Sequence, residues 1–387
     1  MNEPSTLLDS YDLKCLICSK SAQGFRFGIQ SCRACAAFFR RTTVLNRKYK
    51  CVKRKGNCDL NSEEKLSCRY CRLKKCVDLG MTTENVRLEE TAEIVISTSQ
   101  SETTKRRIRD PPTIVDVSQI IKKSRNILEM YYLPDDDLYK HLNPLQKLAE
   151  VLKKQRAPQK TDVIFIESVN FLEIFECWEF QMSQTAEWLM NAQEFRELPN
   201  HEKLAFFKLV WAVWRRFERY SMSAEVFGQR SYDEKILLRS YDKAARLGKC
   251  SVDYSAITSF SSPRIAQLFG GKMLEYFDVI VKPFIDLKFN SIETSYMLAQ
   301  ICWNYAARRL QGQTMAASEK FLAGIGDNLH TFYQEEKIEN YAIRITKMMK
   351  IVNSMLTIQL KQESTMDVAM VFDFFNVLVT DPDFFRV

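Results

Sequence analysis

Eight cysteines within the first 71 residues constrain the fold of this 387-residue chain more than any other feature. They form two sets of four, spaced as C-x2-C-x13-C-x2-C and C-x6-C-x9-C-x2-C: Cys15, Cys18, Cys32 and Cys35, then Cys51, Cys58, Cys68 and Cys71. Tetrahedral Zn²⁺ takes four ligands at about 2.3 Å, and a C-x2-C pair supplies two of them together. We therefore predict two closed, structural zinc sites, whose binding energy folds a region with few large aliphatic side chains.

Two further features of the sequence concern these cysteines: the region contains no histidine, so every ligand must be sulfur, and the lack of a secretion signal favours metal binding over disulfides. The three histidines, His141, His201 and His330, all lie outside this region. The N-terminus has no basic start followed by an apolar stretch, so we expect an intracellular protein with reduced thiols. A ring-type ubiquitin ligase or another protein-binding zinc module is the alternative at this point. Cys76, a ninth cysteine, fits a small buried side chain better than a ligand.

The net charge of +8 is concentrated in the same region. Residues 11–81 hold 17 Lys and Arg against 5 Asp and Glu, whereas residues 91–387 hold 38 of each sign. Eight thiolates with two Zn²⁺ would remove about four of these charges, which leaves the region strongly basic. Such an excess is typical of a surface that binds a polyanion, although a solvated basic face is the simpler alternative.

The sequence CRACAAFFRRTTV, residues 32–44, predicts a helix that begins within the first zinc site. It contains no Gly or Pro and several strong helix formers. At helical spacing Phe38 and Phe39 supply the core, and one broad face is basic with small residues at its middle: Arg33, Ala36, Ala37, Arg40 and Arg41. The major groove of DNA admits a helix of this width, and Arg can pair bidentately with guanine.

Residues 68–81, CRYCRLKKCVDLGM, predict a second helix. On it we expect Tyr70, Leu73 and Leu79 to pack, while the basic side chains stay outside and suit phosphates: Arg69, Arg72, Lys74 and Lys75. Phosphate contacts fix the register of a protein on DNA and raise its affinity without reading sequence.

These spacings, together with CRACAAFFRR at 32–41 and CRYCRLKKC at 68–76, resemble the DNA-binding domain of the nuclear hormone receptor family over residues 15–81. The family's usual version of the first element is close to CEGCKGFFRR. The resemblance implies three half-site-selecting positions, two groove-facing arginines and two phosphate contacts: Arg33, Ala34 and Ala37; Arg40 and Arg41; Lys65 and Arg72.

Three departures from the family pattern concern the DNA site. Arg33 stands where the family often has Glu, and Ala36 stands where it usually has the base-reading Lys. The loop between Cys51 and Cys58 has six residues rather than five, and this loop is the family's dimer contact. The half-site and the dimer mode therefore do not carry over. The departures resemble the divergent, supplementary receptors of nematodes.

After residue 88 the composition changes twice, first at the start of residues 89–111 and again beyond residue 111. Residues 89–111 are rich in Ser and Thr and end in a Pro pair, which predicts a hinge, and Lys105–Arg109 is a candidate nuclear import signal. Beyond it apolar residues recur every three or four positions, which predicts an all-α domain with one short hairpin within 228–250. No run of eighteen apolar residues predicts a membrane span. We expect a tail at 1–11, a zinc-stabilised α domain at 12–88, a hinge at 89–111 and a helical domain at 112–387.

The helical domain resembles the family's ligand-binding domain, an all-α helical sandwich. The resemblance rests on residues 195–214, in which Pro199 and Asn200 would make a turn and cap, on 286–294, the start of helix eight, and on 341–349. Nothing in the spacing separates pocket residues from plain core, so no ligand-binding residue is assigned.

Residues 370–375, MVFDFF, are similar to the family's activation helix. The resemblance implies that this helix covers a ligand pocket and completes a groove for an amphipathic coregulator helix, with Asp373 at the partner's N-terminus. Met190 stands where the family has a Lys at the other end of the groove, and Lys208 is the available basic substitute.

The combined expectation is a nuclear, sequence-specific DNA-binding transcription factor, regulated by a small apolar ligand through a mobile C-terminal helix. Its partners would be double-stranded DNA, coregulators and a homodimer or heterodimer partner, with two Zn²⁺ as cofactors. No Ser-His-Asp set, phosphate loop or paired carboxylates indicate an enzyme. The alternatives are a ligand-independent factor, whose helical domain serves only dimer and coregulator contacts, and a zinc-stabilised protein-interaction adaptor.

Overall fold

The computed structural model describes residues 14–20, 25–27, 29–44, 47–51, 55–56, 58, 60, 68–81, 113–130, 136–258, 260–261, 265, 271–310, 312–371 and 375–381. The chain divides into two compact units, residues 1–108 with 367–374 and residues 109–366 with 375–387. Each unit is described by itself. The expected hinge and the candidate import signal lie outside the described residues.

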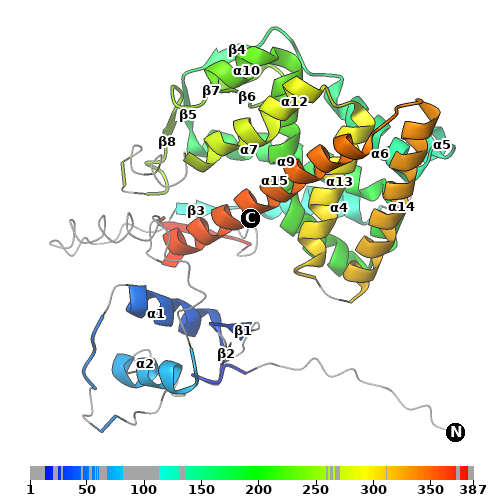
Figure 1. Cartoon of the computed structure of the whole chain (residues 1–387). Helices are drawn as coiled ribbons and strands as arrows, with labels where there is room; N and C mark the ends of the chain where they lie inside the picture. The colour runs from blue at the N-terminus through cyan, green and yellow to red at the C-terminus, as the bar shows by residue number, and fades with distance from the viewer. Residues whose placement is uncertain are drawn as a thin grey trace, which may run out of the picture. The chain divides into compact units, whose positions relative to one another are not determined.

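The first unit is a small α domain with one hairpin. Strands β1 (Phe25–Arg26) and β2 (Ile29–Gln30) pair antiparallel, and helices α1 (Arg33–Val44) and α2 (Arg69–Asp78) lie against each other (Figure 1). The bounds of α1 confirm the predicted helix. Cysteines make up about half of the buried core; the other buried side chains there are Ile17, Ile29, Phe39, Leu60 and Met81.

The packing of α2 differs from the expectation. Tyr70 and Leu79 are exposed, and Met81 is buried in their place. The reason is the C-terminus of the helix, where Gly80 adopts a φ of +88° that favours glycine. The N–H of Gly80 donates to the carbonyl of Val77 (2.9 Å) and that of Met81 to Cys76 (3.0 Å), a Schellman motif. This turn carries Met81 back to the core.

The second unit is a helical sandwich. Helix α13 is buried on nearly all sides and packs against α6, α9 and α14, while α7 packs against α4 and α9, so α9 and α13 form the middle layer (Figure 1). The helices are α4 (Ser118–Leu128), α5 (Asp136–Tyr139), α6 (Pro144–Arg156), α7 (Phe171–Met190), α8 (Gln193–Arg196), α9 (Asn200–Phe227), α10 (Gln229–Glu234), η1 (Phe277–Val281), α12 (Lys282–Leu287), α13 (Ser291–Ala307), α14 (Gln313–Glu335) and α15 (Ala342–Val371).

Short strands join distant parts of this unit. The predicted hairpin is present as β6 (Ile236–Leu238) and β7 (Lys243–Arg246), which pair antiparallel. Three parallel pairs were not predicted: β4 (Ile164–Ile166) with β7, β5 (Ser168–Asn170) with β8 (Ser251–Asp253), and β3 (Thr113–Val115) with β9 (Val377–Val379). Strands of three residues are too short to show alternation in the sequence.

Two further details of the second unit differ from the expected pattern. Pro199 is the N-cap of α9, and Asn200 is the first helical residue, with no side-chain cap. Helix α15 continues without a break through Met370 and Val371, so these residues do not start a separate final helix. Asp373 lies outside the described residues. No helix among those described is both long and apolar enough to cross a bilayer.

Candidate metal centres and nucleic-acid interface

Each set of four cysteines converges on one point. Within each set all four sulfur atoms lie within 4.8 Å of one another. The Sγ atoms of Cys18 and Cys32 are 3.5 Å apart, and that of Cys51 is 3.6 Å from both Cys58 and Cys71. Four sulfurs at about 2.3 Å around a tetrahedral Zn²⁺ would be about 3.8 Å apart. The two groups therefore fit two zinc ions, with no ligand position left for water.

Backbone N–H groups donate to two of the sulfurs in the second group. The N–H of Gly56 donates to Cys51 Sγ (3.3 Å) and that of Cys58 to Cys71 Sγ (3.4 Å). Burial raises the pKa of the Cys35 thiol, so the chain alone does not favour its thiolate, whereas a bound dication would. Cys76 is fully buried and belongs to neither group, as predicted.

Helix α1 starts inside the first site, and the metal would fix its orientation. Ala34 is exposed, and Ala37, Arg40 and Arg41 are half-buried; the side chain of Arg33 is outside the described residues. These positions agree with one accessible basic face. Ala36 is an exception, because it is only 5% exposed and lies on the same side as the buried core of the unit.

Arg72 does not lie outside the unit as expected. Its Nη2 donates to Cys35 Sγ (3.2 Å), and its guanidinium lies over the ring of Phe38, 4.7 Å from the centroid. Phe38 also stacks on Tyr49 at 5.9 Å. Arg72 thus joins α2 to the first metal site, a role that its sequence position did not reveal. Lys65, the other expected phosphate contact, lies outside the described residues.

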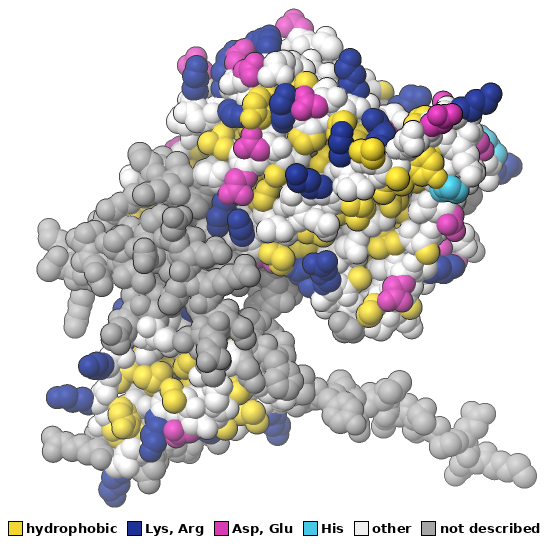
Figure 2. Space-filling model, in the orientation of Figure 1, with side chains coloured by type: hydrophobic (Ala, Val, Ile, Leu, Met, Phe, Trp, Pro, Cys, Tyr) yellow, Lys and Arg dark blue, Asp and Glu magenta, His cyan; other side chains and the backbone are white. Residues whose placement is uncertain are grey.

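About half of the exposed residues described in this unit are basic. Dark blue Lys and Arg side chains surround it in Figure 2, and Asp78 is the one acidic residue among those described between residues 14 and 81. The exposed cations include Lys14, Lys20, Arg47, Lys48, Lys50, Lys55, Arg69 and Lys74. A surface of this charge attracts phosphates at long range.

Comparison with known proteins agrees with both units. Residues 13–83 match the C4-type double treble clef zinc finger, and residues 159–372 match the ligand-binding domain of nuclear hormone receptor. The chain is 50% identical to nuclear hormone receptor family member nhr-54 of Caenorhabditis elegans over the full length of both. The chain belongs to the nuclear hormone receptor family. It is also 38% identical to family member nhr-213 of the same organism, over 93% of this chain and 91% of the relative.

The receptor therefore carries a DNA-binding zinc finger with two four-cysteine groups that can hold two zinc ions, and a mostly helical ligand-binding domain. This confirms the resemblance drawn from the cysteine spacing and the two helical motifs. The ring-type alternative is wrong, because the match to the C4-type finger covers all eight cysteines.

Of the receptor's two expected coregulator residues, Lys208 is among the described residues and Asp373 is not. Lys208, on α9, forms an ion pair with Asp381, which follows β9. Asp373 is outside the described residues. Met190 is fully buried, and its carbonyl accepts a hydrogen bond from Arg196 Nε at 3.0 Å. A cation therefore already caps the C-terminus of α7, where the sequence has lost the usual Lys.

The ligand-binding domain also contains a cavity of about 150 Å³ between α7, α9, the β6–β7 hairpin and the segment before η1. The sequence assigned no residue to it. Three of the side chains that border it, Arg215, Arg216 and Arg219, interrupt a largely apolar stretch of α9. That interruption was the available signal, and helical periodicity alone does not show that it faces a cavity.

Proposed function

We propose that this receptor is a sequence-specific transcription factor that acts in the nucleus, recruits coregulators and responds to a small apolar ligand. The proposed domains are 12–88 for DNA, 89–111 for the hinge and 112–387 for ligand and coregulators. The observation that carries the DNA-binding part is the placement of α1, whose accessible Ala34, Ala37, Arg40 and Arg41 lie on a helix that starts inside a four-sulfur site. Such a helix is rigid enough to enter a major groove.

A binding-site selection with randomised duplexes tests this proposal. Enrichment of one six-base half-site would support direct reading of bases, whereas binding without enrichment would favour the adaptor alternative. Because Ala replaces the usual base-reading Lys at position 36 and is buried, we expect a half-site that differs from the family's common one. Selections with the receptor alone and with added receptor partners would also report dimer spacing.

Arg41→Ala is expected to weaken half-site discrimination strongly. Arg41 is half-buried on α1, and its Nε is buried without a hydrogen-bond partner among the described residues. A bidentate Arg–base contact contributes about 1–3 kcal/mol of discrimination, so the ratio of specific to nonspecific affinity should fall about 10- to 100-fold. Fluorescence anisotropy on the selected and a scrambled duplex measures this ratio, and zinc content should stay at two ions.

Arg47→Ala is the matched control, because Arg47 is exposed and lies beyond the end of α1. Its loss should lower the affinity for both duplexes to a similar small extent and reduce the salt dependence of binding slightly. An unchanged ratio of affinities in the Arg41 variant would refute the groove assignment.

Asp381→Asn is expected to raise the affinity of the receptor for an amphipathic coregulator helix. We propose Lys208 as the basic end of the coregulator groove, and in the structure Asp381 neutralises it. Both side chains are mostly buried, so releasing Lys208 should improve binding by about 2- to 10-fold. Anisotropy with a labelled helical peptide measures this change. The control is Asp286→Asn, which removes the carboxylate of an exposed ion pair on α12. An unaltered affinity would exclude competition between Asp381 and the peptide.

A further inference from the structure

The cavity of the ligand-binding domain is bordered by an unusual concentration of positive charge. Four arginines line it, three from α9 and one that follows β6: Arg215, Arg216, Arg219 and Arg239. Among the described residues that border the cavity there is no Asp or Glu. An apolar wall completes it, including Ile174 and Trp178 of α7 and Leu237 of β6. The cavity thus combines a cationic side with an apolar side.

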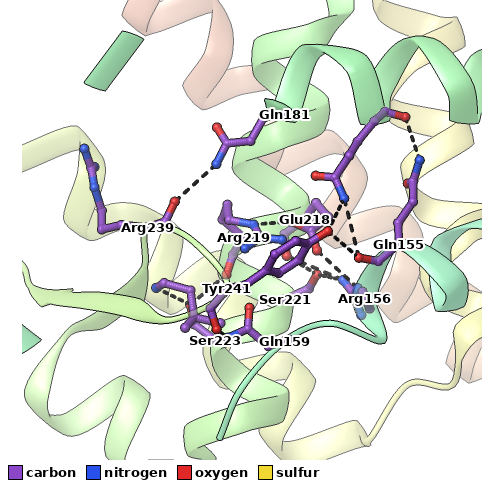
Figure 3. Close-up of polar contacts among 12 residues, drawn as sticks. Gln155, Arg156, Gln159, Gln181, Glu218, Arg219, Ser221, Ser223, Arg239 and Tyr241 are labelled. Atoms are coloured by element: carbon purple, nitrogen blue, oxygen red, sulfur yellow. Dashed lines mark hydrogen bonds and ion pairs between the residues drawn. The ribbon is translucent and has the colours of Figure 1, made fainter. Parts of the chain in front are cut away.

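The arginines differ in how far the protein neutralises them. Arg219 forms an ion pair with the buried Glu218, but this carboxylate also pairs with Arg156, whose Nε lies 3.3 Å from Glu218 Oε1 (Figure 3). Arg216 donates to the neutral side-chain amide of Gln359. Arg156 also pairs with Glu225 at 3.0 Å, so Arg156 and Arg219 share two carboxylates. The hydrogen-bond partner of Arg216, in contrast, adds no negative charge.

Arg215 is the least well compensated of the four. Its guanidinium carbon lies 5.6 and 5.9 Å from the ring centroids of Trp178 and Trp211, and its Nε is buried with no hydrogen-bond partner among the described residues. Burial, followed by the charges of Arg216 and Arg239, lowers the pKa of Arg215 to about 9. Like charges held close together in a partly enclosed space oppose each other, and an anion placed among them would relieve this opposition.

Gln181 adds a neutral polar group to the same wall. It is 5% exposed, its Nε2 donates to the backbone carbonyl of Arg239 at 3.3 Å, and its Oε1 is buried without a partner among the described residues (Figure 3). Gln181 borders the cavity, so a residue of the cavity wall carries this second unsatisfied polar atom. A buried polar atom without a partner is costly, and a bound polar ligand would satisfy it.

We propose that this cavity binds a compact organic acid, whose anionic group lies among the four arginines and whose apolar part lies against Trp178 and Leu237. Planar guanidinium groups recognise carboxylates bidentately and with geometric specificity. A cavity of about 150 Å³ accommodates a molecule near the size of benzene. The inference rests on the proposed ligand response and narrows the ligand from an apolar molecule to a small amphipathic acid.

The test uses benzoate as the probe, benzamide as its neutral isostere and sulfate as an anion without an apolar part. Calorimetric titration of the full receptor is expected to show benzoate binding at least about 10-fold more tightly than benzamide, because only the acid meets the uncompensated guanidinium groups. Sulfate should compete only weakly. Equal binding of benzamide, or equal binding of sulfate, would overturn the proposal of an organic acid.

Two variants locate the binding site. Arg215→Met and Arg239→Met remove one charge each and keep an apolar stem, and each should lower benzoate affinity about 10-fold while leaving benzamide unaffected. Arg239 is only half-buried, so its variant keeps the test available if Arg215→Met does not fold. Arg246→Met is the control, since Arg246 lies in β7 and pairs with Glu234 outside the cavity. Benzoate affinity that is unchanged in both cavity variants would refute the assignment.

Binding of DNA is measured on the same samples, so that the two proposals can fail separately. A wild-type receptor that selects a half-site but does not bind benzoate would refute the acid ligand and leave the DNA function standing. A receptor that binds benzoate through these arginines but selects no half-site would support the ligand class and contradict the proposed transcription factor.

Discussion

Replacing Cys35 with serine is expected to remove one zinc ion, unfold the zinc-binding unit around α1 and lower the affinity for a selected half-site at least about 1,000-fold. Cys35 is fully buried in the first turn of α1, and its sulfur also accepts the hydrogen bond from Arg72 that attaches α2. Structural zinc contributes on the order of 10 kcal/mol, and the few aliphatic side chains of this unit cannot replace it. Metal analysis, circular dichroism and anisotropy on one preparation measure the three effects.

Cys76→Ala is the matched control for this variant. Cys76 is fully buried in the same core and belongs to neither four-cysteine group. Its loss leaves only a small cavity, so we expect two zinc ions, a folded unit and a cost of about 1 kcal/mol. Two retained zinc ions and normal half-site binding in the Cys35 variant would contradict the metal assignment, and with it the view that the metal positions α1.

The metal sites and α1 could be predicted because their determinants are local. A C-x2-C pair fixes two ligands by spacing alone, and residues 32–44 combine strong helix formers with the absence of Gly and Pro. The side chains of Arg72 and Ala36 could not be placed in the same way. Periodicity indicates which residues share a face, but not what covers it: Arg72 meets a sulfur 37 residues earlier in the chain.

Pairings between distant segments account for most of what the sequence missed in the ligand-binding domain. Strands β3 and β9 pair residues 113–115 with 377–379, and neither segment is long enough to show a strand pattern. The arginine-lined cavity depends on α9 meeting the turn after β6, which brings Arg239 to Arg215 and Arg216. The arginines within the largely apolar helix α9 are visible in the sequence, but the partner segment that encloses the cavity with them is not.

Glu293→Ala is expected to destabilise the ligand-binding domain by about 3–5 kcal/mol, because it leaves the half-buried guanidinium of Arg344 and several donors without their acceptor. Glu293 is fully buried near the start of α13. Its Oε2 accepts from Nη2 of Arg344 (2.7 Å) and from the N–H of Asn290 (3.0 Å), and its Oε1 accepts from the hydroxyl of Tyr333 (2.7 Å). Burial and then this hydrogen bond raise the pKa of Tyr333, so it remains a donor.

One carboxylate thus connects the N-terminus of α13 to Tyr333 of α14 and to Arg344 of α15. Its loss should lower the melting temperature of this domain by about 6–15 °C, which calorimetry of the full receptor measures. Asp286→Ala removes a carboxylate from an exposed pair on α12 and should change stability by no more than about 0.5 kcal/mol. If the two variants melted within a degree of each other, Glu293 could not be the group that holds these three helices together.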